Sequence, residues 1–269
     1  NTTTPGLSAE RVLGVDASYN LRYGDFKARI SGYYTRIYDQ SKVISYYDDV
    51  AATFTNFAMS GIDKVHFGLE AAVSIPIYHT LALNGAVSWG QYTYDSNPYY
   101  LQTQDNSGDI VSDGYVYWKD FRVESTPQTA VNVGLSWRSN NNIYLSADFN
   151  YYNNMYLSMS PIYRTDAVIT GGMAPGDIEH LRRQEKFDSA YTLNASIGKN
   201  WYIHRVYMLG FSLEVKNILN DQDIRTGGYE QMRMSKVRGE GGEQIYGRFP
   251  SKYFYLFGTT YYLNLYFRF

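Results

Sequence analysis

Apolar side chains recur at every second position in nine separate segments of this chain, and no other feature restricts its fold as strongly. In the last of these segments, Tyr261, Leu263, Leu265 and Phe267 share one side of an extended backbone. A repeat of two residues is typical of a β-strand with one apolar face, because successive side chains of a strand point to opposite sides. The chain is therefore predicted to be an all-β protein.

The connections between these segments alternate in length, which indicates an antiparallel meander. The expected strands lie at about 10–23, 26–34, 64–73, 81–89, 131–137, 143–151, 191–197, 209–216 and 261–269. Short turns are expected at one end of the sheet, near residues 24–25, 76–79, 140–142 and 201. Long loops are expected at the other end, at about 39–60, 95–125, 157–186 and 219–251. Within the third loop, 177–185 can form a short helix, and this sidedness is typical of outer-membrane β-barrels.

Mean hydropathy is −0.39, but alternating strands cancel in such an average, so the value does not argue against a membrane protein. No run of eighteen apolar residues is present, which excludes a transmembrane helix and leaves a β-barrel as the way to span a bilayer. The 29 tyrosines suit a membrane interface, although a soluble Tyr-rich β-sandwich would have the same composition. Alternation in every strand favours the membrane, as do four aromatic residues near strand ends, Tyr78, Trp89, Trp137 and Trp201.

Charge and cysteine content exclude several classes of function. A net charge of −2 and a pI near 6.1 give no basic surface for nucleic acid. The absence of cysteine excludes disulfides, thiolate metal sites and a cysteine nucleophile. Residues 1–5 lack the features of a signal peptide. Because bacterial single-chain barrels have an even number of strands, nine strands lead us to expect that residue 1 lies in an outer loop of a larger barrel.

Several motifs resemble those of TonB-dependent outer-membrane receptors. The opening stretch Pro5-Gly6-Leu7-Ser8-Ala9-Glu10, followed by Leu13-Gly14-Val15-Asp16, resembles a mid-barrel signature of that family. The segment 211–220, Phe-Ser-Leu-Glu-Val-Lys-Asn-Ile-Leu-Asn, resembles the penultimate strand of these receptors. The segment 227–231 and the ending 249–269 are similar to receptors of the Bacteroidetes type, with the SusC/RagA-like importers as a possible subgroup. The resemblance covers essentially the whole chain.

The resemblance implies that residues 1–269 are the C-terminal part, about nine strands, of a 22-stranded antiparallel transmembrane β-barrel whose plug and earlier strands are absent. It implies transport of a nutrient across the bacterial outer membrane, with an oligosaccharide or other glycan as the leading candidate, without enzymatic activity, cofactor or metal. The implied partners are outer-membrane lipid, the TonB complex through the missing plug, a SusD-like surface lipoprotein and the barrel assembly machinery. The alternative is a complete small outer-membrane barrel acting as a surface enzyme or adhesin, for which Asp177 and His180 are the one candidate pair.

Two sets of residues are assigned roles. Alternate residues of the final strand resemble an outer-membrane assembly signal, which pairs by its edge with the insertion machinery: Tyr261, Leu263, Leu265, Phe267 and Phe269. Aromatic residues beside carboxylates in the expected outer loops can stack on a ligand and accept its hydrogen bonds: Tyr46, Tyr47, Tyr99, Tyr100, Tyr115, Tyr117 and Trp118, with Asp48, Asp49 and Asp120. For any one of these rings taken alone, packing within the loops or at the membrane interface is the favoured interpretation.

Charged residues on the polar side of the strands are expected to line the lumen, where they can form ion pairs with a plug or be hydrated. They are Asp16, Arg22, Lys27, Arg29, Glu70, Asp148, Glu214, Lys216 and Arg268. The four histidines are scattered and lack the spacing of metal ligands, so no metal or catalytic role is expected for them.

Overall fold

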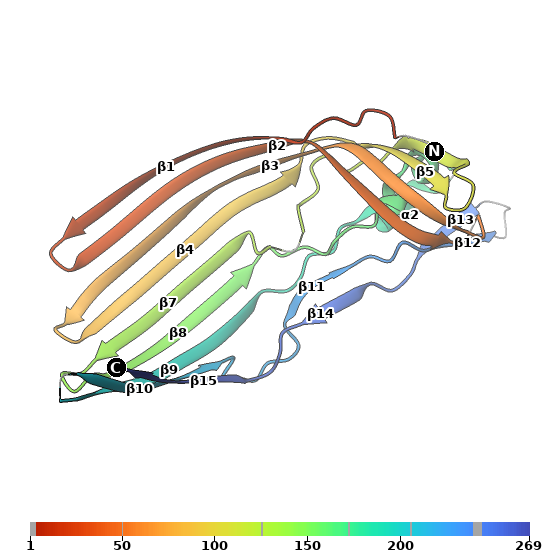
Figure 1. Cartoon of the computed structure of the whole chain (residues 1–269). Coiled ribbons are helices and arrows are strands. Elements are labelled where there is room, and N and C mark those ends of the chain that lie inside the picture. Colours follow the sequence, from red (N-terminus) through yellow and green to blue (C-terminus); the bar gives the residue numbers. More distant parts are fainter. Residues whose placement is uncertain (1–3, 50, 125, 172, 205, 239–243) are drawn as a thin grey trace.

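The computed structural model describes residues 4–49, 51–124, 126–171, 173–204, 206–238 and 244–269. Figure 1 shows a long, curved sheet that carries short turns at one end. The long connections gather at the opposite end of the sheet. This arrangement confirms an antiparallel β-protein with two unlike ends.

Nine strands form one continuous antiparallel meander, in which every strand pairs with its neighbours in the order of the chain. They are β1 (Arg11–Tyr23), β2 (Phe26–Asp48), β3 (Thr53–Tyr78), β4 (Leu81–Tyr94), β7 (Thr129–Arg138), β8 (Ile143–Asn153), β9 (Ala190–Ile203), β10 (Tyr207–Lys216) and β15 (Thr260–Arg268). All nine expected strands are therefore present. Among the described residues the sheet is open, since β1 and β15 are each paired on one side.

The connections carry further, shorter elements. Strands β5 (Tyr99–Gln104) and β6 (Ile110–Tyr115) extend the main sheet from β3. Two separate hairpin-like pairs are formed by β11 (Arg225–Tyr229) with β14 (Lys252–Tyr255) and by β12 (Met234–Arg238) with β13 (Gln244–Arg248). The helices are η1 (Pro161–Arg164), α1 (Asp166–Ile169) and α2 (Pro175–Arg182). In the described part of the chain, none of the helices has the length and apolar character needed to cross a lipid bilayer.

The strand register places apolar residues beside apolar residues across the whole meander. Leu213 of β10, for example, lies opposite Ile197 of β9 on one side and Leu263 of β15 on the other. We call this face the apolar band, and its exposed members include Val15, Tyr19, Ile30, Tyr34, Leu69, Val87, Trp89, Val133, Leu135, Leu145, Phe149, Tyr191, Ile197, Leu209, Leu263, Leu265 and Phe267. A one-residue slip of any strand would move its apolar side chains to the other face, so this continuity fixes the register.

Four local expectations need correction. The predicted loop at 39–60 is wrong, because β2 runs on to Asp48 and β3 begins at Thr53. The segments 42–48 and 53–59 are rich in β-branched and aromatic residues, so they extend the hairpin despite their polar neighbours. The turn at 76–79 is shorter than expected because Pro76 lies within β3. Strand β9 continues past Trp201, and the expected helix at 177–185 begins and ends earlier, as α2.

Candidate functional site in the loop cluster

The buried core of the described chain lies at the end of the sheet that carries the long connections. We define the loop cluster as the distal parts of β2 and β3 (40–62) together with the described residues of 95–128, 154–189 and 217–259. Its core combines buried side chains of β3, 95–128 and 154–189 with one of β4, and it is formed by Phe57, Met59, Ile62, Tyr94 of β4, Tyr100, Val116, Trp118, Met159, Ile162, Tyr163, Val168, Met173 and Leu181. Partly buried side chains of β2 and of 217–259 pack against it: Ile44, Tyr46, Met232, Met234 and Tyr246. Burial of each core side chain stabilises the folded state by about 1.5–3 kcal/mol. Together these side chains can order the connections against one another.

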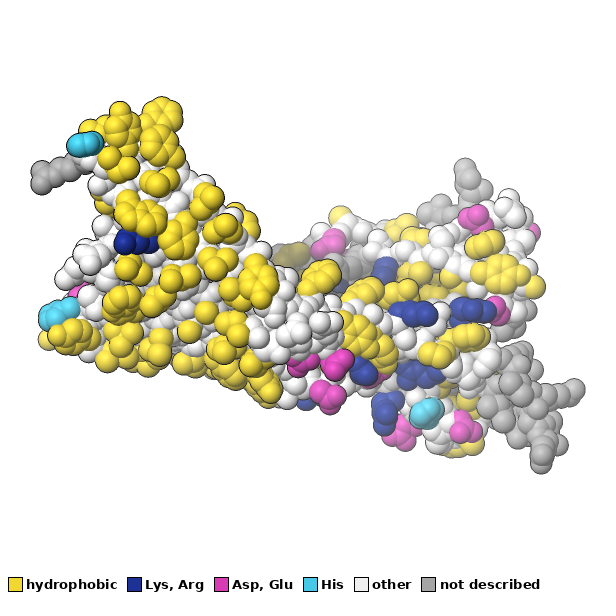
Figure 2. Space-filling view, turned by 90° about the horizontal axis from the view of Figure 1, so that it is seen from below, with side chains coloured by type: hydrophobic (Ala, Val, Ile, Leu, Met, Phe, Trp, Pro, Cys, Tyr) yellow, Lys and Arg dark blue, Asp and Glu magenta, His cyan; other side chains and the backbone are white. Residues whose placement is uncertain are grey.

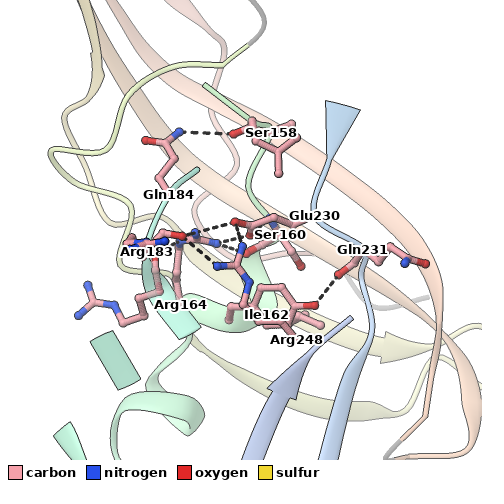
Figure 3. A network of polar contacts seen from close by, with 12 residues as sticks. Ser158, Ser160, Ile162, Arg164, Arg183, Gln184, Glu230, Gln231 and Arg248 are labelled. Atoms are coloured by element: carbon pink, nitrogen blue, oxygen red, sulfur yellow. Dashed lines mark hydrogen bonds and ion pairs between the residues drawn. The ribbon is translucent and has the colours of Figure 1, made fainter. Parts of the chain in front are cut away.

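A buried carboxylate ties two of these connections together. Glu230 is 3% exposed, and its Oε2 accepts hydrogen bonds from Arg164 Nη1 at 2.6 Å and from the Ser160 backbone N–H at 2.8 Å. The Oε1 atom accepts from Arg164 Nη2 at 3.0 Å and from Arg248. Figure 3 shows these side chains converging. The buried carboxylate of Glu230 thus links the connection 154–189 to the connection 217–259.

The guanidinium of Arg164, which is fully buried, also caps the carbonyl groups of its own connection. It donates to the carbonyl oxygens of Ser160 at 2.9 Å, Arg182 at 3.0 Å and Arg183 at 3.4 Å. Its carbon lies 5.2 Å from the ring centroid of Phe121, in the connection 95–128. Since every nitrogen of this guanidinium donates a hydrogen bond, the buried pair with Glu230 has the partners that such a pair requires.

Two of the aromatic residues proposed to face a ligand belong to the core instead. Tyr100 is 2% exposed and stacks on Phe57 with ring centroids 4.5 Å apart. Trp118 is 1% exposed and packs against Tyr94 at 4.7 Å. Other side chains cover the ring of Trp118, so packing is its role in this structure. Tyr100 also lines a pocket, which it shares with residues of the β2–β3 hairpin.

Tyr99 and Tyr117 lie at the surface, where they come together with a third tyrosine. Tyr99 and Tyr115 are cross-strand partners in β5 and β6, with ring centroids 5.8 Å apart. The Tyr99 hydroxyl donates to Asp113 Oδ2 at 2.6 Å, and this hydrogen bond raises the pKa of Tyr99 to about 12. A hydrogen bond to Asp166 raises the pKa of Tyr117. The structure thus places these rings beside the carboxylates of Asp113 and Asp166, which were not predicted from the sequence.

Tyr46 and Tyr47 point to opposite sides of the β2–β3 hairpin. Tyr47 is exposed and meets Phe54 edge to face, with centroids 5.2 Å apart. Tyr46 packs against the core, where burial raises its pKa, and its hydroxyl donates to Asp48 at 3.3 Å. Tyr46 and Asp48 line the same pocket as Tyr100, together with Asp49. This pocket, of about 230 Å³, is where the expected aromatic residues and carboxylates meet.

The charged residues expected in the lumen share the polar face of the sheet, as the register confirms. Arg22 lies opposite Lys27, and Glu214 lies opposite Tyr262. Glu214 also pairs with Lys216 at 3.4 Å, and both side chains are substantially exposed. Such an exposed pair contributes little to stability, so these residues are free to interact with whatever covers the polar face.

No metal site is found among the residues that the structure describes, as judged by groups of His, Cys, Asp and Glu. Asp177 and His180 are both exposed on α2. Hydrolases hold such a pair buried and oriented by a third group, whereas these two side chains are exposed.

The sequence did not point to the residues that organise this cluster. Glu230, Arg164 and Arg248 are distant in the chain, and each looks like an ordinary loop charge until the fold brings them together. The weak signal was the density of aromatic residues and methionines in the connections, which is unusual for solvated loops.

Comparisons with known proteins do not add a relative. No family model matches the chain, and no curated protein matches it. Function is therefore inferred from the chemistry of the two faces of the sheet and of the loop cluster.

Proposed function

We propose that this chain forms part of the wall and the outer loops of a transmembrane β-barrel in the bacterial outer membrane. In this proposal residues 1–269 are the C-terminal portion of a TonB-dependent receptor that imports a nutrient. The observation that carries the proposal is the apolar band, which crosses all nine strands of the meander in register and remains exposed.

The exposure of this band is hard to reconcile with a sheet surrounded by water. Val15 at one edge is 63% exposed and Leu265 at the other edge is 70% exposed. Figure 2 shows apolar side chains covering one face at the sheet end, whereas charged side chains gather at the other end. Soluble monomers rarely expose apolar patches larger than a few hundred Å², roughly, whereas a barrel turns such a band toward lipid.

The edges of the sheet support closure by further strands. Within the described residues, the outer edges of β1 and β15 have no strand beside them. An exposed edge presents a row of free backbone donors and acceptors, and within lipid each of these must be satisfied. We propose that additional strands close the sheet, up to the 22 strands that the family resemblance implies.

The two ends of the sheet support a direction of transport. Outer-membrane barrels have short turns at the periplasmic end and longer loops at the cell surface. The loop cluster would then face the exterior and meet the nutrient, for which an oligosaccharide is the leading candidate. A plug that contacts the TonB complex, a SusD-like surface lipoprotein and the assembly machinery acting on Tyr261, Leu263, Leu265, Phe267 and Phe269 complete the proposal.

Single-cysteine labelling tests the membrane location directly, because the chain contains no cysteine of its own. Leu213→Cys and Val215→Cys place a thiol in the apolar band, and Ser212→Cys and Glu214→Cys place one on the polar face of the same strand. In outer-membrane vesicles, a lipid-soluble maleimide is expected to label the first pair and a charged maleimide the second. Equal labelling of both pairs, or recovery of the protein in the soluble fraction, contradicts the proposal.

The size of the native protein separates the receptor from the alternative of a small barrel. Gels of outer-membrane fractions, run heated and unheated and probed for the last strand, should show a heat-modifiable band several times larger than 30.9 kDa. A heat-modifiable band near 30.9 kDa would instead support a complete small barrel, acting as a surface enzyme or adhesin. For the receptor, loss of TonB in the native host should abolish uptake of the nutrient.

A further inference from the structure

The pocket in the loop cluster has the composition of a binding site. It lies between the end of the β2–β3 hairpin, the segment 162–168, the residues 232–234 and Tyr246, and its volume is about 230 Å³. A cavity of about 150 Å³ accepts benzene, and drug-sized ligands occupy roughly 300–1,000 Å³. The pocket therefore has room for one ring with a short substituent.

Its floor is apolar. The stacked rings of Phe57 and Tyr100 are almost fully buried beneath it, and Ile162 and Val168 belong to the same core. Met232 and Met234 line it from the last connection. Methionine side chains adapt to the shape of a ligand and make favourable contacts with aromatic rings, so this floor suits an aryl or alkyl group.

One wall is a chain of polar side chains centred on a carboxylate. Asp48 Oδ2 accepts a hydrogen bond from Gln102 Nε2 at 2.6 Å, and Asp48 Oδ1 accepts one from the backbone N–H of Ala51 at 3.0 Å. The Gln102 side chain in turn accepts from Ser112 Oγ at 2.9 Å. These bonds hold the carboxylate in place beside the apolar floor of the pocket.

The mouth of the pocket carries a second carboxylate and a guanidinium. Arg233 donates to Asp49 through Nε and Nη2, each at 3.0 Å, and its guanidinium lies 4.4 Å from the ring centroid of Phe249. Among its residues that the structure describes, the lining has the carboxylates of Asp48 and Asp49 and the guanidinium of Arg233. Its field favours a cation, and the faces of aromatic rings add to that preference.

We propose that this pocket binds a small organic cation, an ammonium group attached to a single ring or an equivalent alkyl group. The apolar body lies on the floor of methionines and aromatic rings, and the ammonium group lies toward Asp48 and the mouth. An unmodified sugar fits less well, because the floor offers its hydroxyl groups few hydrogen-bond partners. This inference goes beyond the proposed function and does not depend on a membrane location, since every lining residue belongs to the loop cluster.

The test uses purified full-length chain in detergent and three probes of similar size. Calorimetry should show saturable binding of 2-phenylethylamine. Phenylacetate, which replaces the cation with an anion on the same ring, should bind at least about tenfold more weakly, which corresponds to about 1.4 kcal/mol. Glucose should bind no better than phenylacetate. Equal binding of the amine and the acid, or no saturable binding of the amine, overturns the proposal.

A matched pair of variants locates the binding. Ala167 is exposed and lines the pocket, so Ala167→Trp should obstruct it and weaken binding of the amine at least about tenfold. Ala174→Trp makes the same change at an exposed alanine that is not part of the lining, and it should bind like the unchanged protein. Unchanged affinity in Ala167→Trp overturns the proposal, as does an equal loss in both variants. Because no membrane is present, this result is independent of the cysteine-labelling result.

Discussion

The sheet and the loop cluster distribute their side chains in opposite ways. In the loop cluster, rings such as Tyr163 and Trp118 are buried, and even a carboxylate and a guanidinium are enclosed with all their partners. In the nine-stranded sheet, the apolar side chains are the exposed ones, and the polar residues face one another across the strands. The loop cluster therefore has the side-chain distribution of a protein in water, whereas the sheet has the reverse distribution, which our proposal of a membrane location requires.

This contrast shows what each region needs from its surroundings. The loop cluster carries its own hydrophobic core and can be ordered by internal contacts alone. The strands of the sheet are hydrogen-bonded to one another, but among the described residues no second layer covers the apolar band. The apolar band can therefore be buried only by lipid or by another protein surface. Substitutions in the two regions should therefore have different effects on stability.

The largest effect is expected from Glu230, which neutralises the fully buried Arg164. Replacing Glu230 with alanine leaves that guanidinium uncompensated, and breaking a buried ion pair in this way costs about 3–5 kcal/mol. Limited proteolysis should show the loop cluster cleaved much faster while the sheet resists. As the control, Glu214→Ala removes a carboxylate from an exposed pair in the sheet and should leave cleavage unchanged. If the protease cleaves the loop cluster of Glu230→Ala no faster than that of Glu214→Ala, the ion pairs of Glu230 are not needed to order the loop cluster.

A pair of leucines compares the two regions with the same substitution. Leu181 is 1% exposed in the loop cluster, and Leu181→Ala should lower the stability of that cluster by about 2–5 kcal/mol through lost burial and the cavity left behind. Leu265 belongs to the apolar band, so Leu265→Ala should not alter the opening of the loop cluster. Hydrogen exchange of the connections measures both. If Leu265→Ala opens the loop cluster as strongly as Leu181→Ala, the two regions are not separate in the way described.

Close packing within the sheet itself lies on the polar face. A Cβ at Gly198 would lie 2.1 Å from Cζ of Tyr144, whose hydroxyl donates to the carbonyl of Phe211 at 3.2 Å. Gly198→Ala should therefore displace the Tyr144 ring and cost about 1–3 kcal/mol of unfolding free energy. Gly14 offers the control, because a Cβ there meets its nearest atom at 3.7 Å, and Gly14→Ala should be neutral or slightly stabilising. Urea unfolding in detergent compares the two, and equal midpoints would mean that the Tyr144 ring yields without cost.

The sheet was the part of the fold that the sequence predicted well. A period of two and an alternation of short and long connections locate all nine strands of the meander, since both depend on residues close together in the chain. The hairpin extension at 42–48 and 53–59 escaped prediction because polar residues interrupt its pattern and two register shifts follow Ile37 and Gln40. Whether the sheet closes into a barrel is not a local property, so the pattern of single strands does not determine it.

The candidate site was predictable in composition but not in arrangement. The density of tyrosines and carboxylates pointed to 46–49 and 99–118, and Tyr46, Tyr100, Asp48 and Asp49 do line one pocket. The buried Trp118 could not be told from the more accessible Tyr117 by sequence, because both lie in the same short segment. Arg233 escaped notice because it meets Asp49 across 184 positions of the chain.

The smallest effect is expected at Tyr99, at the surface of the loop cluster. Its hydrogen bond to Asp113 raises its pKa from 10.0 to about 12, so the folded state holds this proton more firmly than the unfolded state does. The stabilisation is complete below pH 10 and is lost as the pH rises through about 12. Nuclear magnetic resonance of ¹³Cζ-labelled tyrosine, with Tyr99→Phe to assign the signal, should show this late titration. Asp113→Asn should move the midpoint toward 10; an unchanged midpoint would show that this carboxylate does not hold the proton, and that even the accessible tyrosines of the loop cluster owe their properties to burial.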